Sequence, residues 1–159
     1  MTETTGKIGI PAGYTALTPF LCVADGSAAI DFYTSAYGAT LVSRIDAPAG
    51  GVAHAELDFG AGRLQLSDAM PDFGLAAPER GPATHSVCFS CEDVDAVVAR
   101  AAALGATIRE APSDFVTGDR YASVIDPFGH RWAIMTRVRE VDPEEAERRL
   151  AEWAAESLS

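Results

Sequence analysis

The chain of 159 residues lacks any apolar run of the roughly 18 residues that a membrane-spanning helix needs. Its first residues, MTETTGKIGIPAGY, also lack the basic and then apolar stretches of a secretory signal, so we expect a cytoplasmic protein. Basic residues are scarce, with 12 Lys and Arg against 23 Asp and Glu and a net charge of −11. Nucleic acids and anionic membranes both attract basic surfaces, so we expect neither as a partner.

Cysteine is scarce as well, and the three thiols are Cys22, Cys88 and Cys91. Cys88 and Cys91 have the spacing of a redox or zinc pair, but they lie in SVCFSC, an apolar stretch that predicts a strand. Residues three apart on a strand point to opposite faces, which argues against a shared disulfide or zinc site. We expect buried or half-buried free thiols.

The chain does contain an internal repeat. YGAT at 37–40 returns as LGAT at 104–107, 67 residues later. Before each copy, a short β-branched and aromatic run (18–23 and 85–91) precedes a segment with apolar residues at helical spacing (27–37 and 94–104). Asp93 suits the N-cap of the second helix, and Gly38 and Gly105 suit left-handed helix ends.

Three strand-like segments follow each predicted helix. They cover 40–45, 52–59 and 63–67 in the first half, and 107–110, 121–125 and 131–136 in the second. The stretch between the halves, residues 70–84, is rich in Pro and Gly and predicts a linker. The expected modules are therefore 14–69 and 85–139, each with the order strand, helix, strand, strand, strand.

The C-terminal residues 140–159 predict one further helix. Asp142 suits its N-cap, Pro143 the first helical position, and Glu145 the matching position of a capping box. An apolar stripe runs along it, formed by Ala146, Leu150, Trp153 and Ala154. Such a stripe packs either on the body of the protein or on a second subunit.

Four stretches carry a resemblance to a known family: AIDFYTSAYGATLVSR (29–44), HAELDFGAGRLQLSD (54–68), CEDVDAVVARAAALGAT (91–107) and GDRYASVIDPFGHRWAIMT (118–136). They resemble the vicinal oxygen chelate superfamily, which includes glyoxalases, bleomycin resistance proteins and dioxygenases, and within it the PhnB-like branch. The resemblance implies an α+β fold, with two βαβββ modules forming a curved mixed sheet around a cavity, plus the C-terminal helix. It also implies a homodimer.

The resemblance also indicates where a metal would bind. In metal-using relatives, the first and last strands of each module supply the ligands of a divalent ion. Those positions correspond here to Thr18, Gln65, His85 and Ala133. Thr18 is a poor ligand and Ala133 is none, whereas a tightly held catalytic ion takes at least three protein ligands. We therefore expect no metal cofactor, with a divalent ion as the less favoured alternative.

Catalytic candidates come from strand alternation in the first module. His54 and Glu56 share one face of a predicted strand, and Gln65 shares a face of the next. If these faces line the cavity, His85 joins them, and an imidazole beside a carboxylate can transfer protons. The catalytic candidates are therefore His85, His54 and Glu56. Two alternatives stay open: a solvent-exposed polar face, and a metal site rebuilt from these three residues.

Ligand-binding candidates are the polar and aromatic strand residues that could face a cavity. Arg120 could fix an anionic group through its planar guanidinium, although an ion pair with Asp119 or Asp126 would explain it equally well. His130 is expected on a surface turn. The expected ligand contacts are Thr18, Phe20, Gln65, Arg120, Tyr121 and Trp132.

These patterns leave three functions open. The favoured hypothesis is a glyoxalase-like or PhnB-like protein that binds a small organic molecule in a sheet-lined cavity without the usual metal. The second is a metal-dependent lyase or isomerase of the glyoxalase I type. The third is an antibiotic-sequestering resistance protein. Because the fold hosts both enzymes and binding proteins, the sequence does not decide whether the chain catalyses a reaction.

Overall fold

The structure, a computed structural model, describes residues 9–79 and 81–159. The chain divides into two compact units, Met1–Ala77 and Pro78–Ser159, and this division lies within the predicted linker 70–84. No helix in the described part of the chain is long and apolar enough to cross a membrane.

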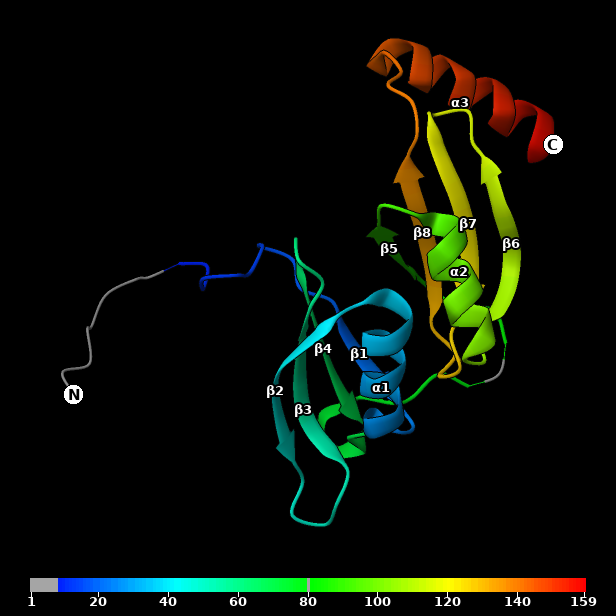
Figure 1. Cartoon of the computed structure of the whole chain (residues 1–159). Helices are drawn as coiled ribbons and strands as arrows, with labels where there is room; N and C mark the ends of the chain where they lie inside the picture. The colour runs from blue at the N-terminus through cyan, green and yellow to red at the C-terminus, as the bar shows by residue number, and fades with distance from the viewer. Residues whose placement is uncertain (1–8, 80) are drawn as a thin grey trace. The chain divides into compact units, whose positions relative to one another are not determined.

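The first unit contains one α-helix and a four-stranded mixed sheet (Figure 1). Its elements are β1 (Phe20–Val23), α1 (Gly26–Tyr37), β2 (Thr40–Asp46), β3 (Val52–Asp58) and β4 (Arg63–Asp68), followed by a 3-10 turn, η1 (Pro71–Phe73). The strand order is β1-β4-β3-β2. β1 is parallel to β4, and the other neighbours are antiparallel.

The second unit repeats this topology and adds the C-terminal helix (Figure 1). Its elements are β5 (Ser86–Ser90), α2 (Val94–Ala103), β6 (Thr107–Asp114), β7 (Asp119–Ile125), β8 (Arg131–Arg137) and α3 (Pro143–Ser157). The strand order is β5-β8-β7-β6, again with the first and last strands parallel. The predicted α+β class, with two βαβββ modules and a C-terminal helix, is confirmed, and neither sheet closes on itself.

One face of each sheet is covered by the helix of the same unit, and the core lies between them. In the first unit the helical core residues are Ala29, Ile30, Tyr33 and Ala36, and those of the sheet are Leu21, Val23, Ala55, Leu57, Leu64 and Leu66. In the second they are Val94, Val97, Val98 and Ala101, with Ala122, Val124, Trp132 and Ile134.

The opposite side of each sheet, which we call the helix-free face, carries the intervening strand residues because side chains alternate along a strand. In the first unit it presents Phe20, His54, Glu56, Arg63 and Gln65. In the second it presents Ser86, Cys88, Glu110, Tyr121, Ser123, Arg131 and Ala133.

The predicted helix ends are confirmed. The Asp93 carboxylate accepts the Ala96 backbone N–H at 3.0 Å, as an N-cap should. Gly38 and Gly105 have φ angles of 74° and 103°, a left-handed conformation that an L side chain disfavours. The two helices therefore start and stop where the repeat in the sequence indicated.

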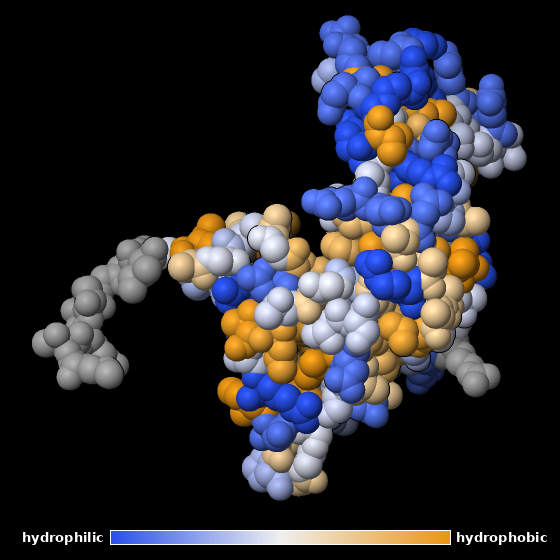
Figure 2. Space-filling model, in the orientation of Figure 1, coloured by the Kyte–Doolittle hydropathy of each residue, from blue (hydrophilic) through white to orange (hydrophobic). Residues whose placement is uncertain are grey.

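The capping box at α3 is only half formed. The Asp142 carboxylate accepts the Glu144 backbone N–H at 3.0 Å. Glu145 does not complete the box, because its carboxylate is paired along the helix with Arg148 at 2.7 Å and Arg149 at 2.6 Å. Figure 2 shows a mostly hydrophilic surface over this helix.

Two predicted environments were wrong. His130 was expected on a surface turn, but only 5% of it is exposed, because it immediately precedes β8 and shares the core side with Trp132. Cys88 was expected to be buried or half-buried, but it is exposed on the helix-free face, while Cys22 is buried and Cys91 is half-buried. None of the three thiols is in a disulfide, and Cys91, beside Thr136, lies on the side of the sheet opposite Cys88, as strand alternation predicted.

Candidate functional site

The helix-free face of the first unit brings four predicted residues together. Glu56 on β3 lies directly opposite Gln65 on β4, and Gln65 Nε2 donates to Glu56 Oε1 at 3.4 Å. The Phe20 ring, from β1, lies 6.0 Å from the His54 ring. Phe20, His54, Glu56 and Gln65 thus form one surface, although their roles in binding or catalysis stay predictions.

Arg63 is the residue of this surface that the sequence analysis missed. Its Nη1 lies 3.5 Å from Glu56 Oε2, and its guanidinium stacks over the Tyr14 ring at 4.7 Å. Arg63 precedes Gln65 by two residues on β4, so strand alternation alone would have placed both side chains on the same face. Glu56 is consequently a paired carboxylate, which leaves it less available as a metal ligand.

The helix-free face of the second unit carries a larger hydrogen-bonded network. Arg131 lies at its centre: its Nη2 lies 3.0 Å from Glu110 Oε2 and 2.9 Å from the Tyr121 hydroxyl. Nη1 of the same guanidinium donates to Ser86 Oγ at 2.8 Å. The Ser123 hydroxyl donates to Glu110, and Tyr121 also donates to Glu110 at 3.2 Å. Four strands therefore contribute to a single polar network.

Only Tyr121 of this network was predicted as a ligand contact. The pairing of Glu110 with Ser123 could not be foreseen, because β6 contains register shifts between Ile108 and Glu110 and again between Glu110 and Ser113. Such irregularities change the face on which a residue lies. Arg131 could have been found, since it occupies the same place at the start of the last strand as Arg63 does in the first unit.

The network also lowers the pKa of the Glu110 carboxyl. The hydrogen bond from Ser123 lowers the pKa of the Glu110 carboxyl, and Tyr121 and Arg131 lower it further, against the opposing effect of burial. Each of these partners favours the ionised form. At neutral pH the network therefore contains a carboxylate that accepts hydrogen bonds and a guanidinium that donates them.

We expect Glu110→Gln to reduce stability at neutral pH but not in acid. A lowered native pKa means that the carboxylate contributes stability above its unfolded pKa, about 4.3, and that this contribution disappears as pH falls through the native pKa. Urea unfolding followed between pH 7 and pH 3 should show parent and variant converging in acid. The contribution is modest because the Glu110 side chain is 56% exposed.

Glu147→Gln, at an exposed position on α3, is the matched control and should run parallel to the parent at every pH. A gap between Glu110→Gln and the parent that stays constant down to pH 3 would contradict the assignment.

His85, a predicted catalytic residue, does not lie on the helix-free face of its own sheet. β5 begins at Ser86, and Ser86 pairs with Arg131 on the helix-free face. His85, one residue earlier, lies 5.7 Å from the core-side ring of His130, and its Nδ1 lies 3.3 Å from the Thr84 hydroxyl. A shift of one residue reverses the face of a strand residue, so Ser86 holds the position predicted for His85.

Two predicted ligand contacts, Trp132 and Arg120, lie on the helix-covered face of the second sheet. Trp132 is only 1% exposed, and its indole N–H donates to Asp126 Oδ2 at 2.9 Å in the core. Arg120 binds Asp95 on α2 through two hydrogen bonds of 2.6 and 2.8 Å, and Asp114 through one of 3.1 Å. Arg120 therefore pairs with neither Asp119 nor Asp126, the partners considered from the sequence. Its guanidinium binds Asp95 and Asp114 on the α2 side of the sheet.

Comparison with known proteins identifies the family. The model of the Glyoxalase/Bleomycin resistance protein/Dioxygenase superfamily matches residues 13–134. The chain belongs to this superfamily. An uncharacterized protein of Mycobacterium tuberculosis H37Rv, Rv0887c, is 37% identical over 134 residues, which is 82% of this chain and 79% of the relative.

Solved structures of other proteins share the fold. TioX from Micromonospora sp. ML1 is 26% identical with a TM-score of 0.62, covering 77% of this chain and 98% of TioX. A PhnB protein from Bacillus cereus is 18% identical with a TM-score of 0.60, covering 77% of this chain and 99% of its own. At that identity the PhnB protein supports the shared fold alone.

The residues at the superfamily's metal-ligand positions do not fit a divalent ion. Thr18 is half-buried two residues before Phe20, and Gln65 is bonded to Glu56. Ala133, between Cys88 and Ser123 in the sheet, offers no donor atom, and Ser86 has the place expected for His85. No group of three or more His, Cys, Asp or Glu side chains gathers anywhere in residues 9–79 and 81–159. We therefore derive no chemistry through a metal.

Proposed function

We propose that the chain binds a small organic molecule on the helix-free sheet faces and that it does so without a divalent ion. The observation that carries this proposal is the network of Arg131, Glu110, Tyr121 and Ser123 around Ala133. A metal-using relative would carry a carboxylate at that alanine. Here the alanine side chain offers no ligand atom, and the surrounding groups donate and accept hydrogen bonds.

The chemistry of the two faces indicates the class of ligand. The Phe20 and His54 rings in the first unit, and the Tyr121 ring in the second, suit a flat or apolar body. Arg131 and Ser86 can donate to carbonyl or hydroxyl oxygens, while Glu110 neutralises much of the Arg131 charge. A neutral molecule with polar oxygens at one end therefore fits better than a strongly charged one.

The first test is whether the protein needs a metal. We expect elemental analysis of the purified, untagged chain to find no stoichiometric ion, and nickel, zinc and manganese to leave Tm unchanged. One ion per chain that raises Tm and is lost in His54→Ala or His85→Ala would instead support the metal-dependent lyase or isomerase.

The second part of the test is a ligand screen by thermal shift. A ligand that raises Tm should lose most of that shift in Arg131→Gln and keep it in Arg120→Gln, because Arg120 points to the α2 side of the same strand pair. Equal loss in both variants would contradict binding at the helix-free face.

The homodimer expected from the family stays a prediction, which light scattering of the full chain would test.

A further inference from the structure

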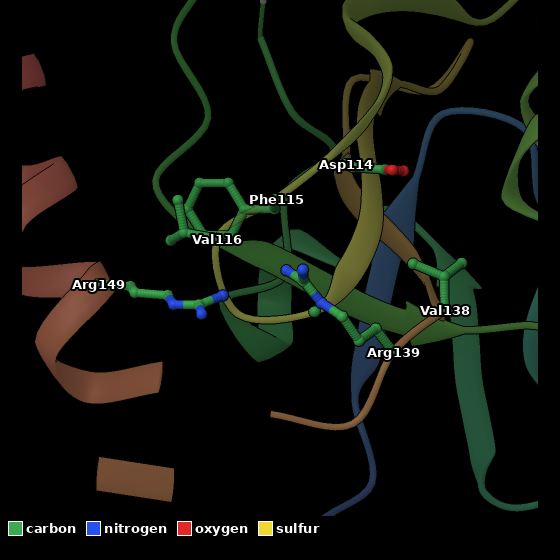
Figure 3. A pocket seen from close by; sticks show the side chains of 7 residues that line it. Asp114, Phe115, Val116, Val138, Arg139 and Arg149 are labelled. Carbon is green, nitrogen blue, oxygen red and sulfur yellow. The ribbon is translucent and has the colours of Figure 1, made fainter. Parts of the chain in front are cut away.

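A separate cavity lies in the second unit, between the β6–β7 turn, the segment after β8, and α3 (Figure 3). Its volume is about 560 Å³, which is within the range of small-molecule sites. The residues lining it are Asp114, Phe115, Val116, Gly118, Val138, Arg139 and Arg149. None of them belongs to the Arg131 network.

Backbone hydrogen bonds join two of the segments that line the cavity, the β6–β7 turn and the segment after β8. The Phe115 N–H donates to Asp119 O at 2.7 Å, which closes the β6–β7 turn. The N–H groups of Val138 and Arg139 both donate to Gly118 O, at 3.1 and 3.0 Å. The segment that carries Arg139 is thus tied to the turn that carries Phe115, so the cavity walls hold their positions.

Two guanidinium groups converge on this space. Figure 3 shows Arg139 and Arg149 pointing toward one another, while the Asp114 carboxylate points away from them. Asp114 is already bound to Arg120 at 3.1 Å. In a chain with a net charge of −11, two facing cations without a carboxylate between them form a local positive site.

The two arginines have different partners. Arg149 donates from Nε to Glu145 Oε1 at 2.6 Å, which orients the group and leaves its Nη nitrogens for the cavity. Hydrogen bonds from Arg148 and Arg149 lower the pKa of Glu145 to about 2, so this pairing persists at neutral pH. The Arg139 side chain, by contrast, makes no ion pair within the part of the chain that the structure describes.

The wall beside the arginines is apolar. The Phe115 ring lies 5.2 Å from Trp153 in an edge-to-face contact and 6.1 Å from Tyr121. Val116 and Val138 complete this wall. An occupant would therefore meet an aromatic and aliphatic surface on one side and cationic donors on the other.

We propose that this cavity binds a small organic anion, a carboxylate or phosphate ester with an aromatic or apolar body. The anionic group accepts from Arg139 and Arg149, whose planar guanidiniums match two-oxygen groups. The apolar body packs on Phe115. This site takes a charged ligand, whereas the helix-free face suits a neutral one, and the proposal does not depend on the proposed function.

The test is a ¹⁵N–¹H NMR titration of the full chain with benzoate, with benzamide as its neutral isostere. We expect benzoate to shift the amide signals of 114–118 and 138–140, and benzamide to bind at least about tenfold more weakly, since a charge-assisted hydrogen bond is lost. Adding salt should weaken benzoate binding and leave benzamide unchanged.

Arg139→Gln should reduce benzoate affinity by at least about tenfold and leave benzamide affinity unchanged. Arg148→Gln is the matched control, because Arg148 binds Glu145 and Glu152 on the same helix and does not line the cavity. It should bind benzoate like the parent. A melting curve for each variant confirms that the chain remains folded, as expected at these exposed positions.

Three results would overturn the proposal. One is equal affinity for benzoate and benzamide. The second is benzoate binding that Arg139→Gln does not weaken. The third is a set of shifted signals confined to the strands of the Arg131 network, which would place the anion on the helix-free face.

Discussion

Asp126→Ala is expected to lower the free energy of unfolding by about 3 to 5 kcal/mol. Asp126 is only 3% exposed and sits in the turn between β7 and β8. Its Oδ1 accepts the backbone N–H groups of Phe128 and His130, both at 2.9 Å, and its Oδ2 accepts Trp132 Nε1 at 2.9 Å. Alanine would leave these three donors without their acceptor, and two of them are deeply buried.

Urea unfolding followed by tryptophan fluorescence would measure this loss, since Trp132 and Trp153 both lie in the second unit. Asp126→Asn keeps the acceptor for the backbone donors and should cost less than half as much. Trp132→Phe removes the indole donor and part of a buried ring but keeps the Asp126 acceptor for the backbone N–H groups, so it should fall between the parent and Asp126→Ala. A loss below about 1 kcal/mol for Asp126→Ala would show that the turn holds without the carboxylate.

Asp68→Ala is expected to destabilise the first unit by about 2 to 3 kcal/mol. Asp68 closes β4, and its two oxygens accept the backbone N–H of Gly26 at 2.5 Å and of Val52 at 2.6 Å. It thereby joins the start of α1 and the start of β3 to the end of the parallel strand pair. Removing it releases two partly buried main-chain donors.

The second unit offers a matched comparison for Asp68. Thr136, near the end of β8, holds the same place in the repeat, and its hydroxyl accepts the Val94 backbone N–H at 2.9 Å at the start of α2. Thr136→Val removes one acceptor instead of two, so about 1 kcal/mol is expected. Amide hydrogen-exchange rates would localise each effect: those of Gly26 and Val52 should rise in Asp68→Ala, and that of Val94 in Thr136→Val. If Thr136→Val costs as much as Asp68→Ala, the second acceptor contributes nothing.

The elements that the sequence predicted well are those set by neighbours along the chain. The carboxylates of Asp93 and Asp142 cap α2 and α3 where they were expected, and Gly38 and Gly105 mark the ends of α1 and α2. These devices act within one helical turn, so they can be seen in the sequence alone. Family membership was expected from the resemblance of four stretches (29–44, 54–68, 91–107 and 118–136) to the superfamily, and the match of the family model to residues 13–134 confirms it.

The site was predicted in part because strand alternation is local but register is not. His54, Glu56 and Gln65 share a face because β3 and β4 pair without interruption. His85 missed its expected face because the strand begins one residue later, at Ser86. Arg120 had acidic neighbours nearby in the chain, yet its main partner is Asp95, 25 residues away on α2. Which of several carboxylates an arginine binds depends on their distances in the folded structure and not on their separation along the chain.

By itself, the sequence determined the order of the elements and the duplication. Only the tertiary structure decided that Arg131 gathers Glu110, Tyr121 and Ser86, and that Arg139 and Arg149 meet beside Phe115. Each grouping joins residues from at least three separate segments of the second unit. A periodic pattern shows which way a side chain points on its own element, whereas pairing register and packing determine what it meets.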